Sequence, residues 1–281
     1  MKRFFILSSI CSFLYAGSSI NNLILTEDNS ITTNSYIRDA TIEQGLIEVK
    51  NATIDNSKFN FTNKIDKSNI THNAYVRQAK ISLNKSSIIN SNISLTDTIS
   101  NSIINNATID QSIITLQESS EIRDSNITST NLINKLTTGG TSSVKQAYIL
   151  MDSGSKINKS KITLNNTVDD TYISDSHIYQ AELIMSSGFI DNATISNTNK
   201  VLNNSSLTDS TLTQGKIEVN GGATLSHNIT ISSTADKLQM TNSTLDMCGV
   251  TINSDSIGDI TKICNISNVT INSARVTISD S

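Results

Sequence analysis

Residues that could act as acids, bases or ligands are sparse in this sequence, and the densest group lies between positions 169 and 177. Asp169 and Asp170 are adjacent, and Tyr172, Asp175 and His177 follow shortly after them. Paired carboxylates are the groups that cleave glycosidic bonds. Acidic residues also gather in solvated turns before strands. We favour the turn, and predict no catalytic residues.

Three arginines share one local context. Arg38 lies in Tyr-Ile-Arg-Asp, Arg77 in Tyr-Val-Arg-Gln and Arg123 in Glu-Ile-Arg-Asp. If they fall in register on successive turns of a repeat, they form a basic stripe that can hold an anionic glycan. The alternative interpretation is three solvated corners, because no run of like charges accompanies them.

Other chemistry is not indicated. His72, His177 and His227 are isolated, and the motifs of phosphate loops, zinc proteases and serine hydrolases are missing. We therefore predict no cofactor and no metal. The formal net charge of -4 and the pI near 5.4 argue against nucleic-acid binding. Asn126, within Asp124-Ser-Asn126-Ile-Thr128, is a possible glycosylation site, because an acidic residue precedes the acceptor sequence by two positions.

The N-terminus has the layout of a secretory signal peptide. Lys2 and Arg3 precede an apolar run that extends to Tyr15, and small residues begin at Ala16. This run is too short to span a membrane, which takes about 20 residues. We expect residues 1–16 to be a signal peptide, residues 17–281 to be the mature domain, and no transmembrane segment to remain after cleavage.

The composition favours strands. Ser, Ile, Asn and Thr make up 153 of the 281 residues, and proline is absent. Ile and Thr are β-branched and suit the pleated strand, whereas Ser and Asn weaken helix interiors. We predict an all-β protein.

A short pattern recurs from about residue 37 to residue 271: apolar, two polar, small, any, apolar. One copy runs from Ile104 through Ala107, Ile109 and Ser112 to Ile114, and another from Leu207 to Val219. Apolar residues five apart fit neither a helix nor a long alternating strand. They indicate short strands joined at corners and stacked as coils, with Ile over Ile and Asn over Asn. We expect coils of about 20 residues and a single elongated domain about 60 Å long, at about 4.8 Å per coil.

The repeat resembles β-solenoid proteins. Ala40-Thr-Ile42-Glu-Gln followed by Gly45-Leu-Ile47-Glu-Val is similar to the pattern of pentapeptide-repeat proteins, and Asn220-Gly-Gly-Ala-Thr-Leu225 resembles haemagglutinin-like and autotransporter-passenger repeats. The resemblance implies a single-domain, right-handed parallel β-helix of the kind found in secreted adhesins.

Two cysteines remain after the predicted cleavage, Cys248 and Cys264, and both occupy the small position of the repeat. Equivalent positions on neighbouring coils lie about 4.8 Å apart, within the Cα separation of roughly 4.4–6.8 Å that a disulfide needs. Because exported proteins meet oxidising conditions, we predict a Cys248–Cys264 disulfide.

Two functions remain open. The first is an exported, non-enzymatic β-solenoid with a structural or adhesive role, in the periplasm or at the bacterial cell surface, with glycans or other envelope or surface proteins as partners. The second is a β-helix enzyme, a lyase or glycoside hydrolase acting on a polysaccharide. A face lined by several carboxylates would favour the second.

Overall fold

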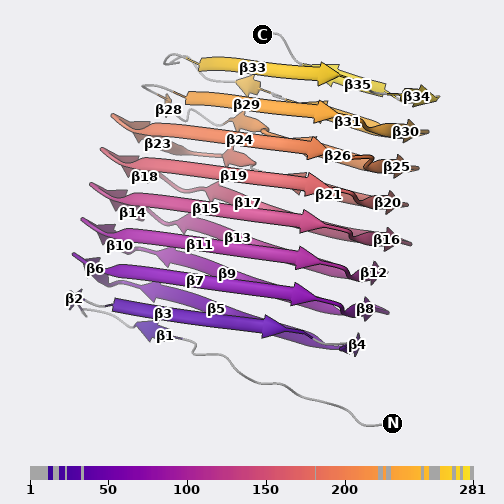
Figure 1. Ribbon diagram of the computed structural model, residues 1–281. Helices are drawn as coiled ribbons and strands as arrows, with labels where there is room; N and C mark the ends of the chain where they lie inside the picture. Colours follow the sequence, from indigo (N-terminus) through magenta and orange to yellow (C-terminus); the bar gives the residue numbers. More distant parts are fainter. Residues whose placement is uncertain are drawn as a thin grey trace.

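Isoleucines that are one repeat apart in the sequence lie above one another in the structure. A column of Cα partners in successive parallel strands contains Ile54, Ile88, Ile122, Ile157 and Ile190. One coil therefore takes 33–35 residues (190 − 157 = 33; 157 − 122 = 35). The computed structural model is a parallel β-solenoid, with its strands stacked along a single axis (Figure 1). All regular elements in the described part of the chain are β-strands.

The structure describes residues 12–14, 19–22, 24–32, 35–180, 182–220, 224–225, 229–247, 250–252, 260–267, 270–272 and 275–278. Within these ranges, no helix is long and apolar enough to cross a membrane.

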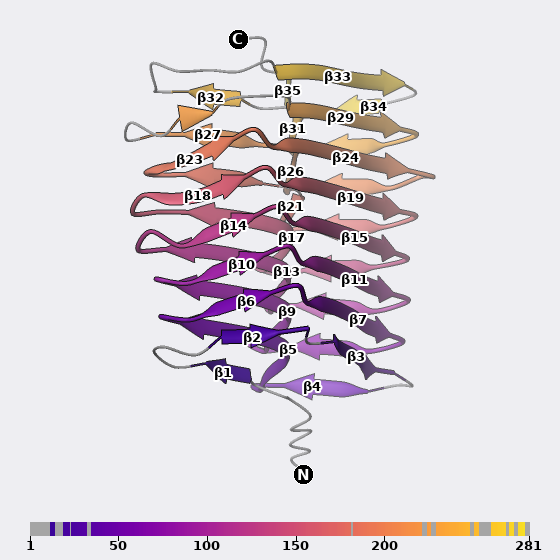
Figure 2. The same cartoon turned by 90° about the vertical axis from the view of Figure 1, so that its left-hand side faces the viewer.

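Each coil passes through four parallel sheets in the order A, B, C and D (Figure 2). Sheet A contains β1 (Ser12–Leu14), β5 (Thr41–Lys50), β9 (Tyr75–Asn84), β13 (Thr108–Gln117), β17 (Ser142–Met151), β21 (Ser176–Gln180), β22 (Leu183–Met185), β26 (Thr211–Gln214), β27 (Ile217–Val219), β31 (Thr244–Met247), β32 (Val250–Ile252) and β35 (Arg275–Ile278). Sheet B contains β2 (Ser19–Asn21), β6 (Thr53–Asp55), β10 (Ser87–Ile89), β14 (Glu121–Arg123), β18 (Ser155–Asn158), β23 (Gly188–Asp191) and β28 (Thr224–Leu225).

Sheet C contains β3 (Ile24–Ile31), β7 (Lys58–Asp66), β11 (Asn92–Ser100), β15 (Asn126–Asn134), β19 (Lys161–Asp169), β24 (Thr194–Leu202), β29 (Ile229–Asp236) and β33 (Ile260–Ser267). Sheet D contains β4 (Tyr36–Arg38), β8 (Asn69–Thr71), β12 (Ile103–Asn105), β16 (Thr137–Gly139), β20 (Tyr172–Ser174), β25 (Ser206–Thr208), β30 (Gln239–Thr241) and β34 (Thr270–Asn272).

The predicted all-β, single-domain solenoid is confirmed, but the predicted coil length is wrong. The observed coil is much longer than the predicted one, because the strands of sheets A and C reach 9 or 10 residues where corners every five were expected. The eight strands of sheet C span about 34 Å at about 4.8 Å each, so the solenoid is shorter than the predicted rod. β1, which pairs with β5, falls inside the predicted signal peptide.

The corners explain much of the composition. Corner residues adopt positive φ, which Asn and Asp tolerate better than most side chains. Between sheets B and C the φ values are 46–49° at Asn56, Asn90, Asp124 and Lys159. A buried serine follows each of these residues and bonds between coils: the backbone N–H groups of Ser57, Ser91 and Ser125 donate to the Oγ atoms of Ser91, Ser125 and Ser160. Serine columns therefore satisfy the buried corner backbone, which strand pairing alone would leave without partners.

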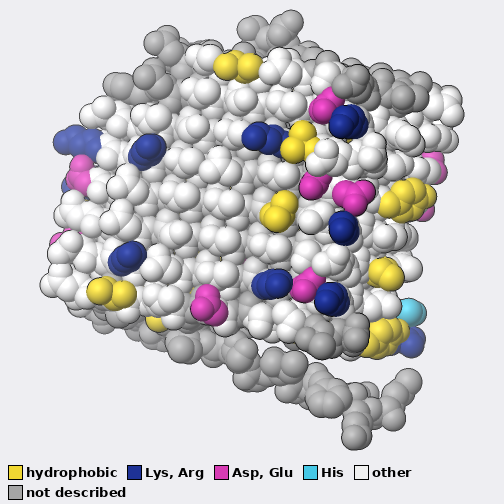
Figure 3. All heavy atoms as spheres, viewed as in Figure 1, with side chains coloured by type: hydrophobic (Ala, Val, Ile, Leu, Met, Phe, Trp, Pro, Cys, Tyr) yellow, Lys and Arg dark blue, Asp and Glu magenta, His cyan; other side chains and the backbone are white. Residues whose placement is uncertain are grey.

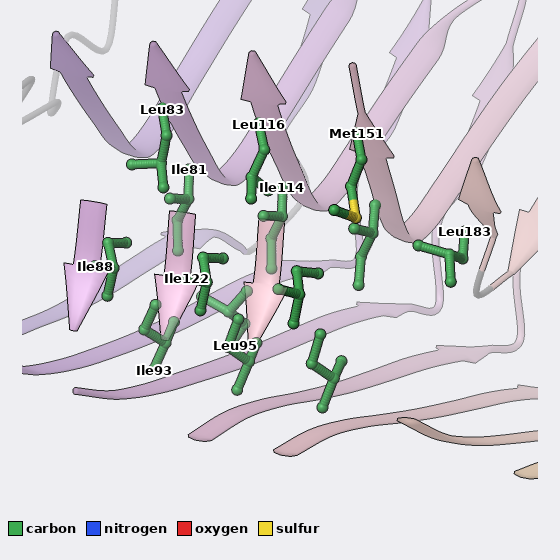
Figure 4. Packing of buried hydrophobic residues seen from close by; sticks show 14 of the residues in the cluster. Ile81, Leu83, Ile88, Ile93, Leu95, Ile114, Leu116, Ile122, Met151 and Leu183 are labelled. Atoms are coloured by element: carbon green, nitrogen blue, oxygen red, sulfur yellow. The ribbon is translucent and has the colours of Figure 1, made fainter. Parts of the chain in front are cut away.

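The interior holds two apolar clusters. In the first, Leu83, Leu116 and Met151 come from successive sheet A strands and lie in a row (Figure 4). The second contains Val76, Ile109 and Val144 from the first half of the same strands. Identical or similar side chains thus stack in columns that continue each cluster from coil to coil.

A polar seam, formed by two buried ladders of side chains, separates the clusters. Along sheet A, each glutamine Nε2 donates to the Oε1 of the glutamine one coil earlier at 2.9–3.0 Å, through Gln44, Gln78, Gln111, Gln146, Gln180 and Gln214. Along sheet C, the facing ladder contains Asn63, Asp97, Asn131, Asn166, Asn199 and Ser233. The interior is therefore not purely apolar, since two columns of hydrogen-bonded polar side chains run through it.

The outer face of sheet C is wide and carries little charge. Its side chains are largely Thr, Ser and Asn, and one column runs through Thr62, Thr96, Thr130, Asn165 and Thr198. Figure 3 shows this broad uncharged area between two groups of charged side chains. On sheet A, Arg77 and Lys145 instead lie over tyrosine rings.

Candidate functional site

The structure does not bring the three predicted ligand-binding arginines together. Arg38 ends β4 in sheet D, Arg77 lies in β9 of sheet A, and Arg123 ends β14 in sheet B. The basic stripe is therefore corrected to three separate positions on three sides of the solenoid. The shared sequence context misled the prediction because similar short patterns occur at several corners of each coil.

The acidic group at positions 169–177 is spread around two corners. Asp169 ends β19, where its Oδ1 accepts a 2.7 Å hydrogen bond from Asn203, and Asp170 has φ 47° at the next corner. Tyr172 points outward from sheet D, Asp175 occupies the following corner, and His177 lies on sheet A. These residues therefore lie on three different sides of the coil, with Asp170 and Asp175 at corners.

The remaining predicted sites lie apart from one another. Asn126 is exposed at the start of β15, and its Nδ2 donates to Asn92 at 3.1 Å. His72 has positive φ at a corner, whereas His227 lies outside the described residues. Within the described ranges no group of three or more His, Cys, Asp or Glu could hold a metal ion.

Cys264 lies in β33, and its Cα partner one coil earlier is Ser233. Cys248 lies outside the described residues. The two cysteines are 16 residues apart in the sequence (264 − 248 = 16), fewer than the 33–35 residues of one coil in sheet B. The pairing itself stays a prediction.

Sheet A carries a bend that positions the richest set of outward side chains. In the strands β9, β13 and β17, the residue after the seam glutamine is small and has positive φ, which is 55° at Ala79 and 54° at both Ser112 and Ala147. This residue breaks the strand alternation, so two consecutive side chains face inward. The bend produces the five-residue spacing from Ile109 to Ile114, whereas the spacing from Ile104 to Ile109 spans the corner at Asn106.

Before the bend, the outer face carries an ion-pair network. The Nη1 of Arg77 lies 2.6 Å from Oε1 of Glu43, and its guanidinium carbon lies 4.9 Å from the centroid of the Tyr75 ring. The Tyr75 hydroxyl accepts a 2.6 Å hydrogen bond from Arg77 and donates to Asp110. Burial and the neighbouring Asp110 raise the pKa of Tyr75 to about 12, so the phenol stays protonated and able to donate.

Farther along the solenoid, one lysine joins two tyrosines across the bend. Lys145 Nζ lies 5.3 Å from the ring centroid of Tyr148 and 5.9 Å from that of Tyr179. His177 stacks beside Tyr179 with centroids 6.2 Å apart. Both tyrosine rings are half-buried, and burial is the main cause that raises the pKa of each phenol.

A carboxyl lies next to these rings. Glu182 is 5% exposed, and burial raises its pKa while Lys216 and Lys145 oppose the shift. Lys216 in turn forms a 2.8 Å ion pair with Glu218, and hydrogen bonds from Lys216 and Asn220 lower the pKa of Glu218. We call the set Lys145, Tyr148, Tyr179, Glu182 and Lys216 the sheet A cluster.

Sequence reasoning missed the sheet A cluster because it assumed the wrong coil length. In the structure, Ile149, Leu183 and Ile217 are paired on successive coils. The residues that precede them in the sequence, Tyr148, Glu182 and Lys216, therefore form one column, with one residue from each coil. Three of the six tyrosines belong to sheet A. The spacing of one coil between Tyr148, Glu182 and Lys216 can be read from the sequence once the coil length is known.

The fold and this outer face define the chain as a parallel β-solenoid with an aromatic, charged face on one sheet. No protein-family model, no curated protein and no solved structure matches it.

Proposed function

We propose that the chain is an exported, non-enzymatic β-solenoid with a structural or adhesive role at the bacterial cell envelope or surface, and that it binds a glycan through the sheet A cluster. The N-terminal sequence pattern supports export. The stacked parallel strands and the similarity of the sequence to pentapeptide and haemagglutinin-like repeats support a rigid surface module. The location would be periplasmic or on the cell surface.

The observation that carries the binding proposal is the pair of tyrosines held beside one lysine. Ligand sites combine apolar and aromatic surface with a few placed polar groups. Here packing and the Lys145 ammonium restrain both rings before any ligand arrives, and this lowers the entropic cost of binding.

Replacing Tyr148 or Tyr179 with Ala should weaken glycan binding by about 2- to 10-fold each, as expected from the loss of about 0.5–1.5 kcal/mol of aromatic contact. The measurement is titration of the mature protein against a panel of bacterial and plant oligosaccharides. Phe189→Ala is the matched control, because Phe189 is an exposed aromatic residue on sheet B. A panel in which no glycan binds would contradict the proposal.

Glu182 and Glu218 favour a second candidate, an enzyme acting on a polysaccharide. The pKa of Glu182 is raised and that of Glu218 is lowered. Two carboxyls whose pKa values are moved apart are typical of an acid and a base at a glycosidic bond. The same panel distinguishes the candidates if released reducing ends are measured. Cleavage that disappears in Glu182→Gln would favour the enzyme.

We also propose that Cys248 and Cys264 form a disulfide across the interior. Met247 and Val250 pair with Gln214 and Ile217, and in the sequence Cys248 follows Met247 as Gly215 follows Gln214. A Cβ built on Gly215 lies 3.3 Å from Oγ of Ser233, the residue one coil before Cys264. Gly215 therefore faces Ser233, and Cys264 is the Cα partner of Ser233 in the next coil.

If this pairing is correct, the exported protein should resist alkylation at both cysteines until it is reduced. Peptide mass spectrometry without reduction should show the two cysteine peptides joined. Two alkylated thiols in the untreated protein would contradict the bridge.

A further inference from the structure

Sheet D exposes large hydrophobic side chains at regular intervals. Tyr36, Ile103 and Tyr172 are 60%, 47% and 45% exposed, among the most exposed large hydrophobic residues in the described part of the chain. Figure 3 shows hydrophobic side chains along the edge that sheet D forms. Leaving this apolar surface in water is unfavourable, so a ligand that covers it gains free energy.

The three side chains stand in one column, on alternate coils. Tyr36 pairs with Asn69, Asn69 with Ile103, Ile103 with Thr137, and Thr137 with Tyr172. The apolar residues are therefore two coils apart, about 9.6 Å at about 4.8 Å per strand. Short polar side chains, an amide and a hydroxyl, lie between them.

The column is uncharged from Tyr36 to Tyr172. Arg38, in the neighbouring outward column, is already paired with Asp39 at 3.2 Å. Thr71 donates a 3.4 Å hydrogen bond to the Tyr36 hydroxyl, which restrains that ring. A charged ligand would find no counter-ion in this column, whereas an uncharged polymer with hydroxyl groups matches both the apolar and the polar positions.

We propose that this column binds an extended, uncharged β-1,4-linked polysaccharide that lies along the solenoid axis. In such a chain each sugar is turned over relative to the next, so every second sugar presents the same face to one side. Two sugars have nearly the length of two coils, and alternate sugars would rest on Tyr36, Ile103 and Tyr172. The intervening sugars would direct hydroxyl groups to Asn69 and Thr137. The inference rests on the proposed function only in taking a glycan as the ligand, because the column of Tyr36, Ile103 and Tyr172 lies on sheet D, apart from the sheet A cluster.

A polyproline II peptide has a similar repeat, three residues of about 3.1 Å each. Domains that read such peptides hold them in grooves lined by aromatic residues. Here the three side chains project singly from an outward column and are separated by hydrogen-bonding groups, which suits a hydroxylated chain better.

The test is titration calorimetry of the full mature protein with cellohexaose, chitohexaose and maltohexaose. The first two are β-1,4-linked and extended, and we expect at least one of them to bind. Maltohexaose is α-linked and curved, so it cannot place alternate sugars on one line and should bind at least 10-fold more weakly. Equal binding of all three would overturn the proposed register, as would binding of a proline-rich peptide at this column in place of the oligosaccharides.

Variants locate the site. Tyr36→Ala and Tyr172→Ala should each weaken binding about 2- to 10-fold. Ile103→Tyr should strengthen binding, whereas Thr137→Tyr places a ring on the wrong coil and should not. Phe189→Ala, on sheet B, is the control. Binding that is unchanged in both tyrosine variants would overturn the inference.

The two glycan proposals fail separately. Loss of oligosaccharide binding in Tyr148→Ala with full binding in Tyr36→Ala and Tyr172→Ala would support the sheet A cluster and refute the sheet D column. The reverse result would support the column and refute the cluster. Circular dichroism that stays β-rich in every variant would exclude unfolding as the cause.

Discussion

Asp97→Asn should stabilise the protein by about 2–4 kcal/mol at pH 8 and change its stability little at pH 4, as estimated from the pKa difference between the folded and unfolded carboxyl. Asp97 is fully buried in the polar seam, at a position where the neighbouring coils carry Asn63 and Asn131. Urea unfolding of both proteins across this pH range would measure the difference.

The hydrogen bonds around Asp97 require a proton on its carboxyl. Asn63 Nδ2 donates to Oδ1 at 2.7 Å, and Oδ2 contacts Ser112 Oγ. Ser112 Oγ also lies 3.3 Å from Asn131 Oδ1, which needs a donor. Ser112 has a single proton to donate. If Asp97 is ionised, Ser112 must donate to it and Asn131 loses its donor. If Asp97 is protonated, it donates to Ser112, Ser112 donates to Asn131, and the ladder continues unbroken.

The electrostatics agree with this count. Burial raises the pKa of Asp97 to about 7, against the lowering effect of the hydrogen bonds from Ser112 and Asn63, and no charged side chain contributes to the shift. In the unfolded chain the carboxyl has a pKa of about 3.9. Between these values the folded protein holds a proton that the unfolded chain has released. Stability therefore falls as the pH rises from about 4 to about 7, and the full penalty persists above pH 7.

The Asp97→Asn variant carries an amide donor in place of this proton at every pH, so it should lose this pH dependence. Asp124→Asn is the matched control, because Asp124 lies at an exposed corner whose φ of 49° suits Asn equally well. It should change stability by less than about 0.5 kcal/mol. An Asp97→Asn protein that is less stable than the parent at pH 8 would contradict the requirement for a proton on the Asp97 carboxyl.

The sequence predicted the stacking but not the size of the coil. Ile stacks on Ile along sheet B, and Asn131, Asn166 and Asn199 stack along sheet C, as the repeat indicated. The five-residue spacing arises only at the corners and at the bend of sheet A. Sheet C alternates with a period of two, and segments such as Thr62 to Asn73 therefore interrupt the spacing. Counting only the corners gave a coil that was too short.

Site prediction failed for a related reason. The number of residues per coil determines which outward side chains lie next to each other on neighbouring coils. A wrong coil length therefore predicts the wrong neighbour for every outward side chain. The spacing between Arg38 and Arg77 is longer than a coil, which places the two residues on different sheets. The buried seam was missed because Gln and Asn are usually exposed residues. Their regular recurrence, at Gln44, Gln78 and Gln111, is the signal that could have identified it.

Gln146→Met should destabilise the protein by about 2–6 kcal/mol, since it removes a buried residue from the middle of the glutamine ladder and leaves two partners unsatisfied at about 1–3 kcal/mol each. Gln146 Nε2 donates to Gln111 at 2.9 Å, and Gln146 Oε1 accepts from Gln180 at 3.0 Å. Met has a similar length and fills the space, so the loss reports the hydrogen bonds rather than a cavity. Chemical unfolding at pH 5 would measure it, where Asp97 contributes equally to both proteins.

Gln214→Met is the matched control at the other end of the ladder. Gln214 Nε2 donates to Gln180 at 2.9 Å, but its Oε1 has no hydrogen-bond partner among the described residues, and Met247 follows in the next coil. Gln214→Met leaves only Gln180 Oε1 without its donor, and it removes Gln214 Oε1, which already lacks a partner. The loss of unfolding free energy should therefore be less than half of that for Gln146→Met. Equal losses in both variants would mean that volume, not ladder hydrogen bonding, sets the stability of the seam. A larger loss at Gln146 would show that the seam acts as a continuous hydrogen-bonded column whose interior positions depend on both neighbours.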